Sequence, residues 1–338
     1  MNVSIISPCR NEVNHIDAFV QSLLGQSSDG LALEFIIADG ESDDGTSEKL
    51  ARWAGADPRI KVIHNQGRIV STGLNRAVEV ARGDIIVRMD AHTTYKPDYI
   101  VECVKSLQST GAMCVGGAWT ASGSHPLQRA ISSAFTSRFG SGGALSRRAD
   151  YDGKVDTVYL GAWWRKDLLR LGGFDEDLIR NQDDELCLRI TRSGGLIWQS
   201  SAIKSTYVPR NSLKALWNQY YQYGYWKVLV IKKHRLPASV RHVIPVVFIA
   251  CVTLSLLLTP VHVVFGLLGL ILLASYLSAS LAAAMQVAGR PYQVRDILYV
   301  VGAFSCMHFG YGLGFSKGVL DFFLRRRGPS LSMSRLTR

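Results

Sequence analysis

The segment Ile85-Ile86-Val87-Arg88-Met89-Asp90-Ala91-His92 joins a short apolar run to two polar residues that are able to share a ligand. Its β-branched residues, bounded by Gly83-Asp84 and Thr93-Thr94, predict a short buried strand. In extended backbone, positions i and i+2 face the same side, so the Asp90 carboxylate and the His92 imidazole are expected to point together. An oxygen and an imidazole so placed fit a divalent metal. By themselves, these residues favour an ordinary polar turn after a strand.

Strands and helices alternate along the first third of the chain, which predicts βαβ units and a mostly parallel sheet. The expected strands are Val3–Ser7, Leu33–Ala38, Ile60–Ile63, Ile85–Met89 and Ala112–Gly117, and the expected helices lie near residues 16–24, 46–53, 71–81 and 97–107. In such sheets, ligands bind beyond the carboxyl ends of the strands. Because Asp39 and Asp90 both follow strands, we expect them to border one crevice.

The predicted crevice contains acidic residues where nucleotide-binding loops of other folds contain glycines. No GxGxxG motif follows the first strand and no GxxxxGK[ST] motif occurs, which disfavours dinucleotide-binding and P-loop sites. Acids that face a phosphate repel it unless a cation intervenes, so a phosphate ligand here requires a divalent metal. Arg10, Arg68 and Arg88 are candidates for phosphate contacts, although each also fits a solvated surface position.

A second acidic cluster, Gln182-Asp183-Asp184-Glu185-Leu186, precedes the apolar residues Leu188 and Ile190 at helical spacing. Acids in the first turn of a helix are stabilised by its dipole, and this structural explanation suffices for the cluster alone. The functional interpretation is that one carboxylate is a general base for a hydroxyl group.

The composition changes after residue 211. Residues 212–242 combine an aromatic amphipathic stretch with lysines and arginines, which fits either a core helix or an interfacial helix. Residues 243–324 are largely apolar. Segments 243–259 and 261–287 predict two membrane spans around Pro260, and the glycine-rich segment 297–320 is expected to be re-entrant or interfacial, with a third full span as the alternative.

Basic residues flank the apolar region, including a tail at 325–338, within a formal net charge of +11. Beside long apolar runs, such clusters favour cytoplasmic membrane flanks over nucleic-acid binding. The first residues, Met1-Asn2-Val3-Ser4, lack the basic region of a signal peptide. We therefore expect no nucleic-acid partner, a location at the inner (cytoplasmic) membrane, and residues 1–211 on the cytoplasmic side.

Four stretches in this order resemble the inverting glycosyltransferases of family 2, which have a GT-A fold, and among them the membrane-bound succinoglycan-type exopolysaccharide β-glucosyltransferases. They are Ser7-Pro8-Cys9-Arg10-Asn11-Glu12, residues 38–46 (ADGESDDGT), Met89-Asp90-Ala91-His92, and Gln182-Asp183-Asp184-Glu185-Leu186. The resemblance covers about residues 2–230 and implies an α/β GT-A domain at 1–211 followed by an α-helical membrane region.

The resemblance also implies roles for individual residues. Asp39 would bind the uracil or ribose, and Asp90 and His92 occupy the DxD position that holds Mg²⁺ or Mn²⁺ at the diphosphate. Asp183 matches the general base that deprotonates the acceptor hydroxyl. The remaining candidates are Pro8, Arg10, Glu12 and Arg68 for the nucleotide sugar, and Trp163, Trp164, Gln182, Tyr225 and Trp226 for the acceptor.

The predicted reaction is transfer of a hexose, with UDP-glucose as the expected donor, onto a lipid-linked saccharide. Tyr225 stands where the QxxRW motif of processive synthases has Arg, which favours addition of a single sugar. Three alternatives stay open: a polyprenyl-phosphate glycosyltransferase, a sugar nucleotidylyltransferase, and a membrane-anchored carbohydrate-binding or scaffold protein.

Overall fold

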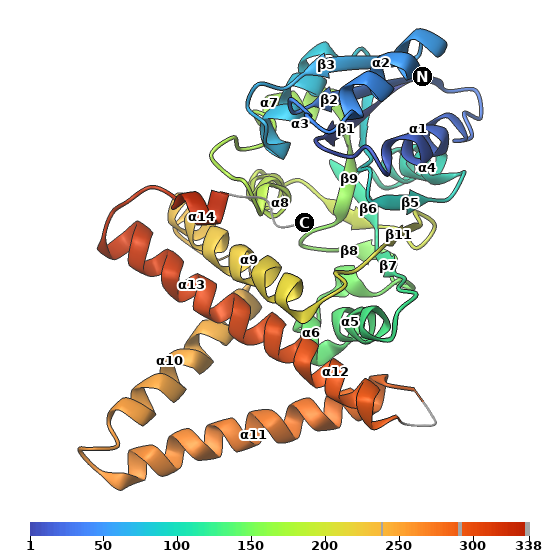
Figure 1. Cartoon of the computed structure of the whole chain (residues 1–338). Coiled ribbons are helices and arrows are strands. Elements are labelled where there is room, and N and C mark those ends of the chain that lie inside the picture. Colours follow the sequence, from blue (N-terminus) through green and yellow to red (C-terminus); the bar gives the residue numbers. More distant parts are fainter. Residues whose placement is uncertain (238, 290–292, 335–338) are drawn as a thin grey trace. The chain divides into compact units, whose positions relative to one another are not determined.

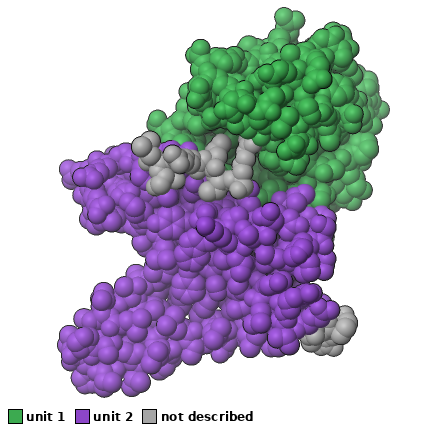
Figure 2. Space-filling view, in the orientation of Figure 1, with its two compact units in different colours: residues 1–120, 145–207 green, residues 121–144, 208–338 purple. Residues whose placement is uncertain are grey.

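The computed structural model describes residues 1–237, 239–289 and 293–334, and the chain forms two compact units (Figures 1 and 2). Unit 1 comprises residues 1–120 and 145–207, and unit 2 comprises residues 121–144 and 208–338. Residues 121–144 thus group with the C-terminal helices, whereas the sequence predicted one continuous domain over 1–211. Arg290, Arg335 and Arg338, which belong to the predicted basic flanks and tail, lie outside the described residues.

Unit 1 is built on an eight-stranded sheet with the order β3-β2-β1-β4-β9-β6-β10-β8. Strands β3, β2, β1 and β4 are parallel neighbours, and β6 pairs in parallel with β10. Strand β9 is antiparallel to both β4 and β6, and β8 is antiparallel to β10. The strands are β1 (Asn2–Cys9), β2 (Ala32–Asp39), β3 (Ile60–His64), β4 (Ile85–Arg88), β6 (Cys114–Gly117), β8 (Gly153–Lys154), β9 (Tyr159–Trp164) and β10 (Ile197–Gln199).

The period of two along the central strands divides the apolar core into two layers. On β4, Ile85 and Val87 face one core cluster while Ile86 faces the other. The first layer is covered by α1 (Ile16–Leu24), α2 (Thr46–Ala56) and α4 (Tyr99–Thr110); the second by α3 (Val70–Val80), α7 (Arg165–Arg170) and α8 (Gln182–Arg192). The mostly parallel sheet with flanking helices confirms the predicted fold class.

The direction of chain progression reverses between β1 and β4. The order β3-β2-β1 places successive strands on one side, and β4 then pairs on the other side of β1. In open α/β sheets, such a switch point is where the carboxyl ends of the strands leave a crevice for a ligand. The residues that follow β1 and β4 are therefore expected to border a ligand site.

Several strands were not predicted from the sequence. They include the central β9 and a small sheet of β5 (Thr93–Tyr95), β11 (Ser205–Tyr207) and β7 (Trp119–Ala121). Each is short or interrupted by glycine, and each finds its partners far away in the chain. Ile86 of β4, for example, pairs with Trp163 of β9.

Unit 2 is helical. Its α-helices include α5 (Pro126–Thr136), α6 (Arg138–Ser141), α9 (Leu213–His234), α10 (Ile244–Leu257), α11 (Val263–Val287) and α14 (Leu331–Ser334). A long helix spans Val294–Leu324. It consists of α12 (Val294–Ser305), the π-helical turn η3 (Cys306–Gly310), α13 (Tyr311–Val319) and a second π-helical turn η4 (Leu320–Leu324). Two of the described helices, Val263–Val287 and Val294–Leu324, are long and apolar enough to cross a membrane.

Two of the predicted membrane segments differ in length from the helices observed in the apolar region. The segment predicted to be re-entrant or interfacial, 297–320, lies within one helix of 31 residues. The segment predicted as the first span is helical over the 14 residues Ile244–Leu257. At 1.5 Å per residue this helix is about 21 Å long, less than the ~30 Å of a hydrocarbon core.

Glycines on the long helix let it approach α9 closely. A Cβ added at Gly314 would lie 1.9 Å from the carbonyl oxygen of Tyr221, and one added at Gly318 would lie 2.8 Å from that of Tyr225. Small residues at four-residue spacing allow such close contact between helix backbones. The aromatic helix α9 is thus packed along one face against the third apolar segment.

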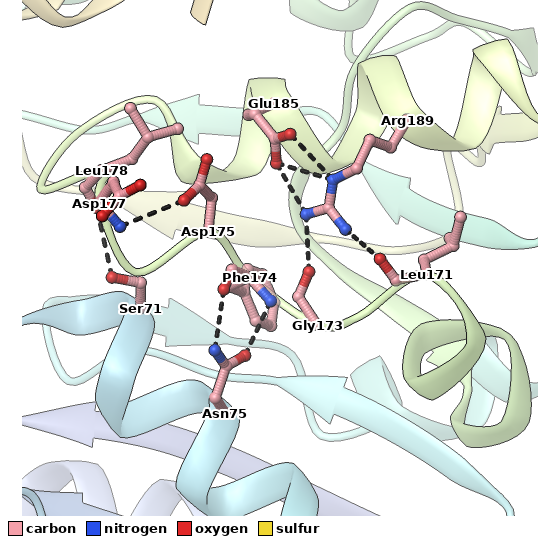
Figure 3. A network of polar contacts seen from close by, with 10 residues as sticks. All are labelled: Ser71, Asn75, Leu171, Gly173, Phe174, Asp175, Asp177, Leu178, Glu185 and Arg189. Atoms are coloured by element: carbon pink, nitrogen blue, oxygen red, sulfur yellow. Dashed lines mark hydrogen bonds and ion pairs between the residues drawn. The ribbon is translucent and has the colours of Figure 1, made fainter. Parts of the chain in front are cut away.

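A network of polar contacts fixes the segment that leads into α8 (Figure 3). The side-chain amide of Asn75 on α3 donates to the Phe174 carbonyl at 2.8 Å and accepts from the Phe174 amide at 2.7 Å. Arg189 on α8 forms an ion pair with the fully buried Glu185 at 2.7 Å and also donates to the Gly173 carbonyl at 2.6 Å. These contacts fix the start of α8, which carries Asp183, on unit 1.

We expect Arg189→Met to destabilise unit 1, because it leaves the buried Glu185 carboxylate without the guanidinium. Removing one partner of a buried ion pair costs about 3–5 kcal/mol, which corresponds to a fall in Tm of roughly 6–20 °C for a unit of this size. Thermal unfolding of the detergent-solubilised chain measures it. Arg192→Met, at an exposed position of the same helix, is the matched control and should lower Tm by about 2 °C at most. Equal Tm values for the two variants would contradict the anchoring role of Arg189.

Candidate active site

Arg88 connects the two acidic motifs of the sequence. Its Nε and Nη2 donate to the two carboxylate oxygens of Asp90, each at 2.8 Å, and its Nη1 donates to Oδ1 of Asp183 at 2.5 Å. The guanidinium is nearly buried, whereas 26% of the Asp90 side chain and 35% of the Asp183 side chain remain exposed. Arg88 therefore contacts both Asp183, the predicted general base, and Asp90, a residue predicted to bind the metal at the diphosphate.

The chain positions this arginine and its partners firmly. Arg88 is the last residue of β4, and Asp90 follows it at i+2, on the same side of the strand. The Asp90 amide donates to the Tyr95 hydroxyl at 2.6 Å, which fixes the turn after β4. Asp183 lies in the first turn of α8, the helix that Figure 3 shows anchored through Arg189.

Burial and charge act on Asp183 in opposite directions. Burial raises the pKa of this carboxyl, the Arg88 guanidinium lowers it, and the neighbouring Asp90 carboxylate raises it again. The net result is a pKa above the ordinary value for aspartate. Burial lowers the pKa of Arg88, but the two carboxylates more than compensate, so this guanidinium stays charged. A carboxylate with a raised pKa is a stronger proton acceptor, as a general base requires.

Asp39, the last residue of β2, is buried and hydrogen-bonded. Its carboxylate accepts hydrogen bonds from the Ser42 hydroxyl at 2.6 Å and the Ser42 amide at 3.2 Å, and also from the Ser47 hydroxyl. These contacts satisfy and orient the carboxylate within the loop between β2 and α2. Asp39 ends β2 and Asp90 follows β4, which lie on opposite sides of β1, and their convergence on one ligand stays a prediction.

Residues after β1 and β4 meet at the switch point. His92 Nε2 lies 2.8 Å from Oε1 of Glu12, and the His92 ring packs edge-on against that of His15, with centroids 5.2 Å apart. Among the described residues, Glu12, His15 and His92 form a group whose potential ligand atoms all lie within 4.8 Å of one another. A carboxylate and two imidazoles suit a divalent transition metal, so the residues present fit the metal that the sequence predicts.

The other predicted nucleotide-sugar residues lie at or after the carboxyl ends of β1 and β3. Pro8 is on β1 beside β2, and Arg10 follows that strand; a Cβ added at Gly40 would lie 3.3 Å from the Arg10 Cβ. Arg68 is exposed and forms an ion pair with Glu41. Its role as a phosphate contact stays a prediction.

The acceptor-side residues need revision. Trp163 is buried in the core against Phe174, with ring centroids 5.7 Å apart, because β9 is a central strand. Tyr225 and Trp226 are fully buried on α9, where the Tyr225 hydroxyl donates to Asp321 and the Trp226 indole donates to the Met333 carbonyl. Buried rings offer no face for a sugar. Trp164, which is half-buried, and Gln182, which is buried at the start of α8, stay predictions.

Two features of the site were missed in the sequence. Arg88 was considered a phosphate contact, but it joins the acidic motifs, and its i, i+2 spacing with Asp90 was an available signal. His15 was not considered at all. The only signal for His15 was its position in the sequence, three residues after Glu12 and directly before the helix expected at 16–24.

Comparison with known proteins identifies the family. The model of glycosyl transferase family 2 matches residues 4–171. The succinoglycan biosynthesis protein ExoA of Rhizobium meliloti (strain 1021) is 32% identical over 325 residues, which cover 96% of each protein. This chain belongs to glycosyl transferase family 2. Among other relatives of this family 2 glycosyltransferase, a dolichyl N-acetyl-α-D-glucosaminyl phosphate 3-β-D-2,3-diacetamido-2,3-dideoxy-β-D-glucuronosyltransferase of Methanococcus voltae is 26% identical over 68% of the chain and 74% of that protein.

A solved structure shows the same fold. The mannosyltransferase PcManGT from Pyrobaculum calidifontis, in complex with GDP-Man and Mn²⁺, superimposes with a TM-score of 0.55 at 21% identity, over 90% of this chain and 86% of that one. The likeness confirms the predicted GT-A fold. Membership of glycosyl transferase family 2 makes this chain an enzyme that uses a nucleotide sugar, as predicted.

Proposed function

We propose that this family 2 enzyme transfers a hexose from a nucleotide sugar, UDP-glucose, to a hydroxyl group of a lipid-linked saccharide, with inversion at the anomeric carbon. The observation that carries the proposal is the Arg88 bridge, which brings Asp183 and Asp90 into one site of unit 1. The similarity to a succinoglycan biosynthesis protein along nearly the whole chain supports a role in exopolysaccharide synthesis.

Asp183 acts as the general base. Its carboxylate accepts the proton of the acceptor hydroxyl as that oxygen attacks C1 of the donor sugar, and the nucleoside diphosphate leaves from the opposite face. Arg88 holds Asp183 in place and favours its ionised form, since the guanidinium opposes the effect of burial on its pKa. A divalent metal with His92 among its ligands would supply positive charge that stabilises the leaving diphosphate.

The donor's uridine binds at Asp39. The carboxylate is already oriented by Ser42 and Ser47, so it can accept hydrogen bonds from the ribose or base without reorganisation. The acceptor is held by a lipid, which is consistent with two helices apolar enough to cross a membrane in the same chain. We place the enzyme at the cytoplasmic membrane with unit 1 on the cytoplasmic side.

We expect Asp39→Ala to weaken donor binding, raising the KM for UDP-glucose by about tenfold or more with a small change in kcat. Loss of a hydrogen bond to a charged group costs about 1.5–3 kcal/mol, and binding that is equal in ground and transition states appears in KM. Steady-state kinetics with varied donor measure it. Asp43→Ala, at an exposed carboxylate of the same loop, is the matched control. An unchanged donor KM in Asp39→Ala would exclude Asp39 from the nucleotide pocket.

Assaying the purified, detergent-solubilised chain against a panel of nucleotide sugars tests the proposed reaction. Each donor is offered with a lipid-diphosphate oligosaccharide and, separately, with bare polyprenyl phosphate. The proposal predicts metal-dependent transfer of glucose from UDP-glucose to the oligosaccharide. Transfer to polyprenyl phosphate alone would assign the enzyme to the rival acceptor class. Preferential use of another donor would overturn the assignment of UDP-glucose.

A further inference from the structure

We propose that Glu12, His15 and His92 form the metal site of this enzyme, and that the site selects a transition-metal ion such as Mn²⁺, Co²⁺ or Zn²⁺ over Mg²⁺. The role of the ion at the donor diphosphate rests on the proposed function, whereas the site itself rests on the geometry of these three side chains. The proposal replaces Asp90 by Glu12 and His15 in the predicted ligand set.

The three side chains converge from both sides of the switch point. Glu12 and His15 follow β1, and His92 follows β4, the strand that pairs beside it. Their potential ligand atoms lie within 4.8 Å of one another, and His92 Nε2 is 2.8 Å from Glu12 Oε1. An ion with ligands at about 2.0–2.2 Å separates its ligand atoms by roughly 3 Å, so small side-chain rotations suffice to bind one.

The backbone around Glu12 is fixed before any ion binds. The Glu12 amide donates to the Thr46 hydroxyl at 2.7 Å, and the Glu12 carbonyl accepts from the amides of His15 and Ile16, both at 2.8 Å. Glu12 is buried, whereas about half of the His92 side chain is exposed and His15 is exposed as well. A site with a rigid buried carboxylate and exposed imidazoles leaves open positions for substrate oxygens.

Asp90 has a different task in this structure. Both of its carboxylate oxygens accept hydrogen bonds from the Arg88 guanidinium, which also holds Asp183. Binding an ion through Asp90 would set its positive charge against that guanidinium. We therefore assign Asp90 as a positioning residue for Arg88.

The donor set determines the metal. Mg²⁺ prefers six oxygen ligands in strict octahedral geometry and keeps several of its waters, whereas imidazole ligands suit first-row transition ions, whose affinity for a given site is lowest for Mn²⁺ and higher for Co²⁺ and Zn²⁺. Two histidines and one carboxylate, with the remaining positions open, match the facial arrangement of transition-metal sites. If no ion binds, the same residues form only a His92–Glu12 contact. The experiment must therefore distinguish a metal site from this contact alone.

Isothermal titration of the purified full-length chain with MnCl₂, and separately with MgCl₂, tests the site without nucleotide. We expect one Mn²⁺ site, with Mg²⁺ at least tenfold weaker. His15→Ala should weaken Mn²⁺ binding at least ~10-fold, and it is a safe substitution because the His15 side chain makes no capping hydrogen bond to α1. Asp90→Asn should change Mn²⁺ affinity less than about threefold. His64→Ala, which removes an exposed histidine paired with Glu41 at 3.5 Å, is the matched control and should have no effect.

Unchanged Mn²⁺ affinity in His15→Ala, or loss of binding in Asp90→Asn, would overturn the proposal and return the site to the Asp90–His92 pair. Absence of Mn²⁺ binding in the unaltered chain would also overturn it. The proposed function is judged separately, by glycosyl transfer. A chain that binds Mn²⁺ as described but transfers no sugar would refute the reaction and leave the metal site standing.

Discussion

The Asp183→Asn enzyme is expected to lose about 10²–10⁴ of its kcat and to bind the donor with unchanged affinity. A positioned general base contributes this factor, and asparagine cannot accept the proton of the acceptor hydroxyl. The amide keeps the size of the side chain and an oxygen that accepts from Arg88 Nη1, so the local geometry should survive. Single-turnover transfer measures the chemical step, and titration with the nucleotide sugar measures donor binding.

Asp184→Asn is the matched control, because it removes the neighbouring carboxylate from the same helical turn and leaves the Arg88–Asp183 contact in place. Its kcat should stay within a few-fold of the unaltered enzyme. Comparable losses in the two variants would indicate a general electrostatic effect of the first turn of α8. Normal turnover by Asp183→Asn would show that another group is the base.

Replacing Arg88 by glutamine is expected to move the acidic limb of the pH profile to higher pH and to lower kcat/KM at neutral pH by about 10²-fold. The guanidinium lowers the pKa of Asp183 while burial and Asp90 raise it, so removing the guanidinium raises that pKa further. The base must be ionised to act, and activity then appears only at higher pH. Loss of the bridge also releases Asp183 from its position, and a misplacement of about 1 Å is enough for a 10²-fold loss.

Arg88→Lys separates charge from geometry. Lysine keeps a positive charge but cannot donate to both Asp90 oxygens and to Asp183 at once. Its acidic limb should lie between those of the unaltered enzyme and Arg88→Gln, while its kcat/KM at the pH optimum stays reduced. An acidic limb that does not move in Arg88→Gln would show that Arg88 does not control the ionisation of the base.

The parts of the fold that follow local patterns were predictable. Apolar strands such as Ile85–Arg88 alternate with amphipathic helices, and their punctuation by glycine and acidic turns placed β1–β4 and α1–α4 within a few residues of their observed bounds. The same pattern placed Asp39 at the carboxyl end of β2 and Asp90 just after β4.

The parts that depend on distant pairing were not predictable. Strand β9 contains Gly161 and Ala162 and shows no alternation, and its place between β4 and β6 comes from partners far along the chain. Trp163 was therefore interpreted as an exposed acceptor contact, although it lies in the core. The same limit applies to Arg88, whose contact with Asp183 spans 95 residues.

The helical unit shows a second limit, since apolar composition alone does not distinguish lipid-facing from packed helices. Aromatic residues on α9 resemble an interfacial or sugar-binding surface, but Tyr225 and Trp226 are buried, and glycines of the long helix pack against the α9 backbone. The glycine spacing was visible at Gly310, Gly314 and Gly318. The sequence did not show that α9 is the helix against which these glycines pack.

The anomeric configuration of the product tests the central claim, a single displacement assisted by Asp183, most directly. The enzyme is incubated with UDP-α-glucose and a lipid-diphosphate oligosaccharide, and the new linkage is read from the coupling constant of its anomeric proton by NMR. A single displacement gives a β-linked glucose from the first turnover onward. An α-linked product would contradict it, because retention cannot arise from one in-line attack by a hydroxyl that Asp183 deprotonates.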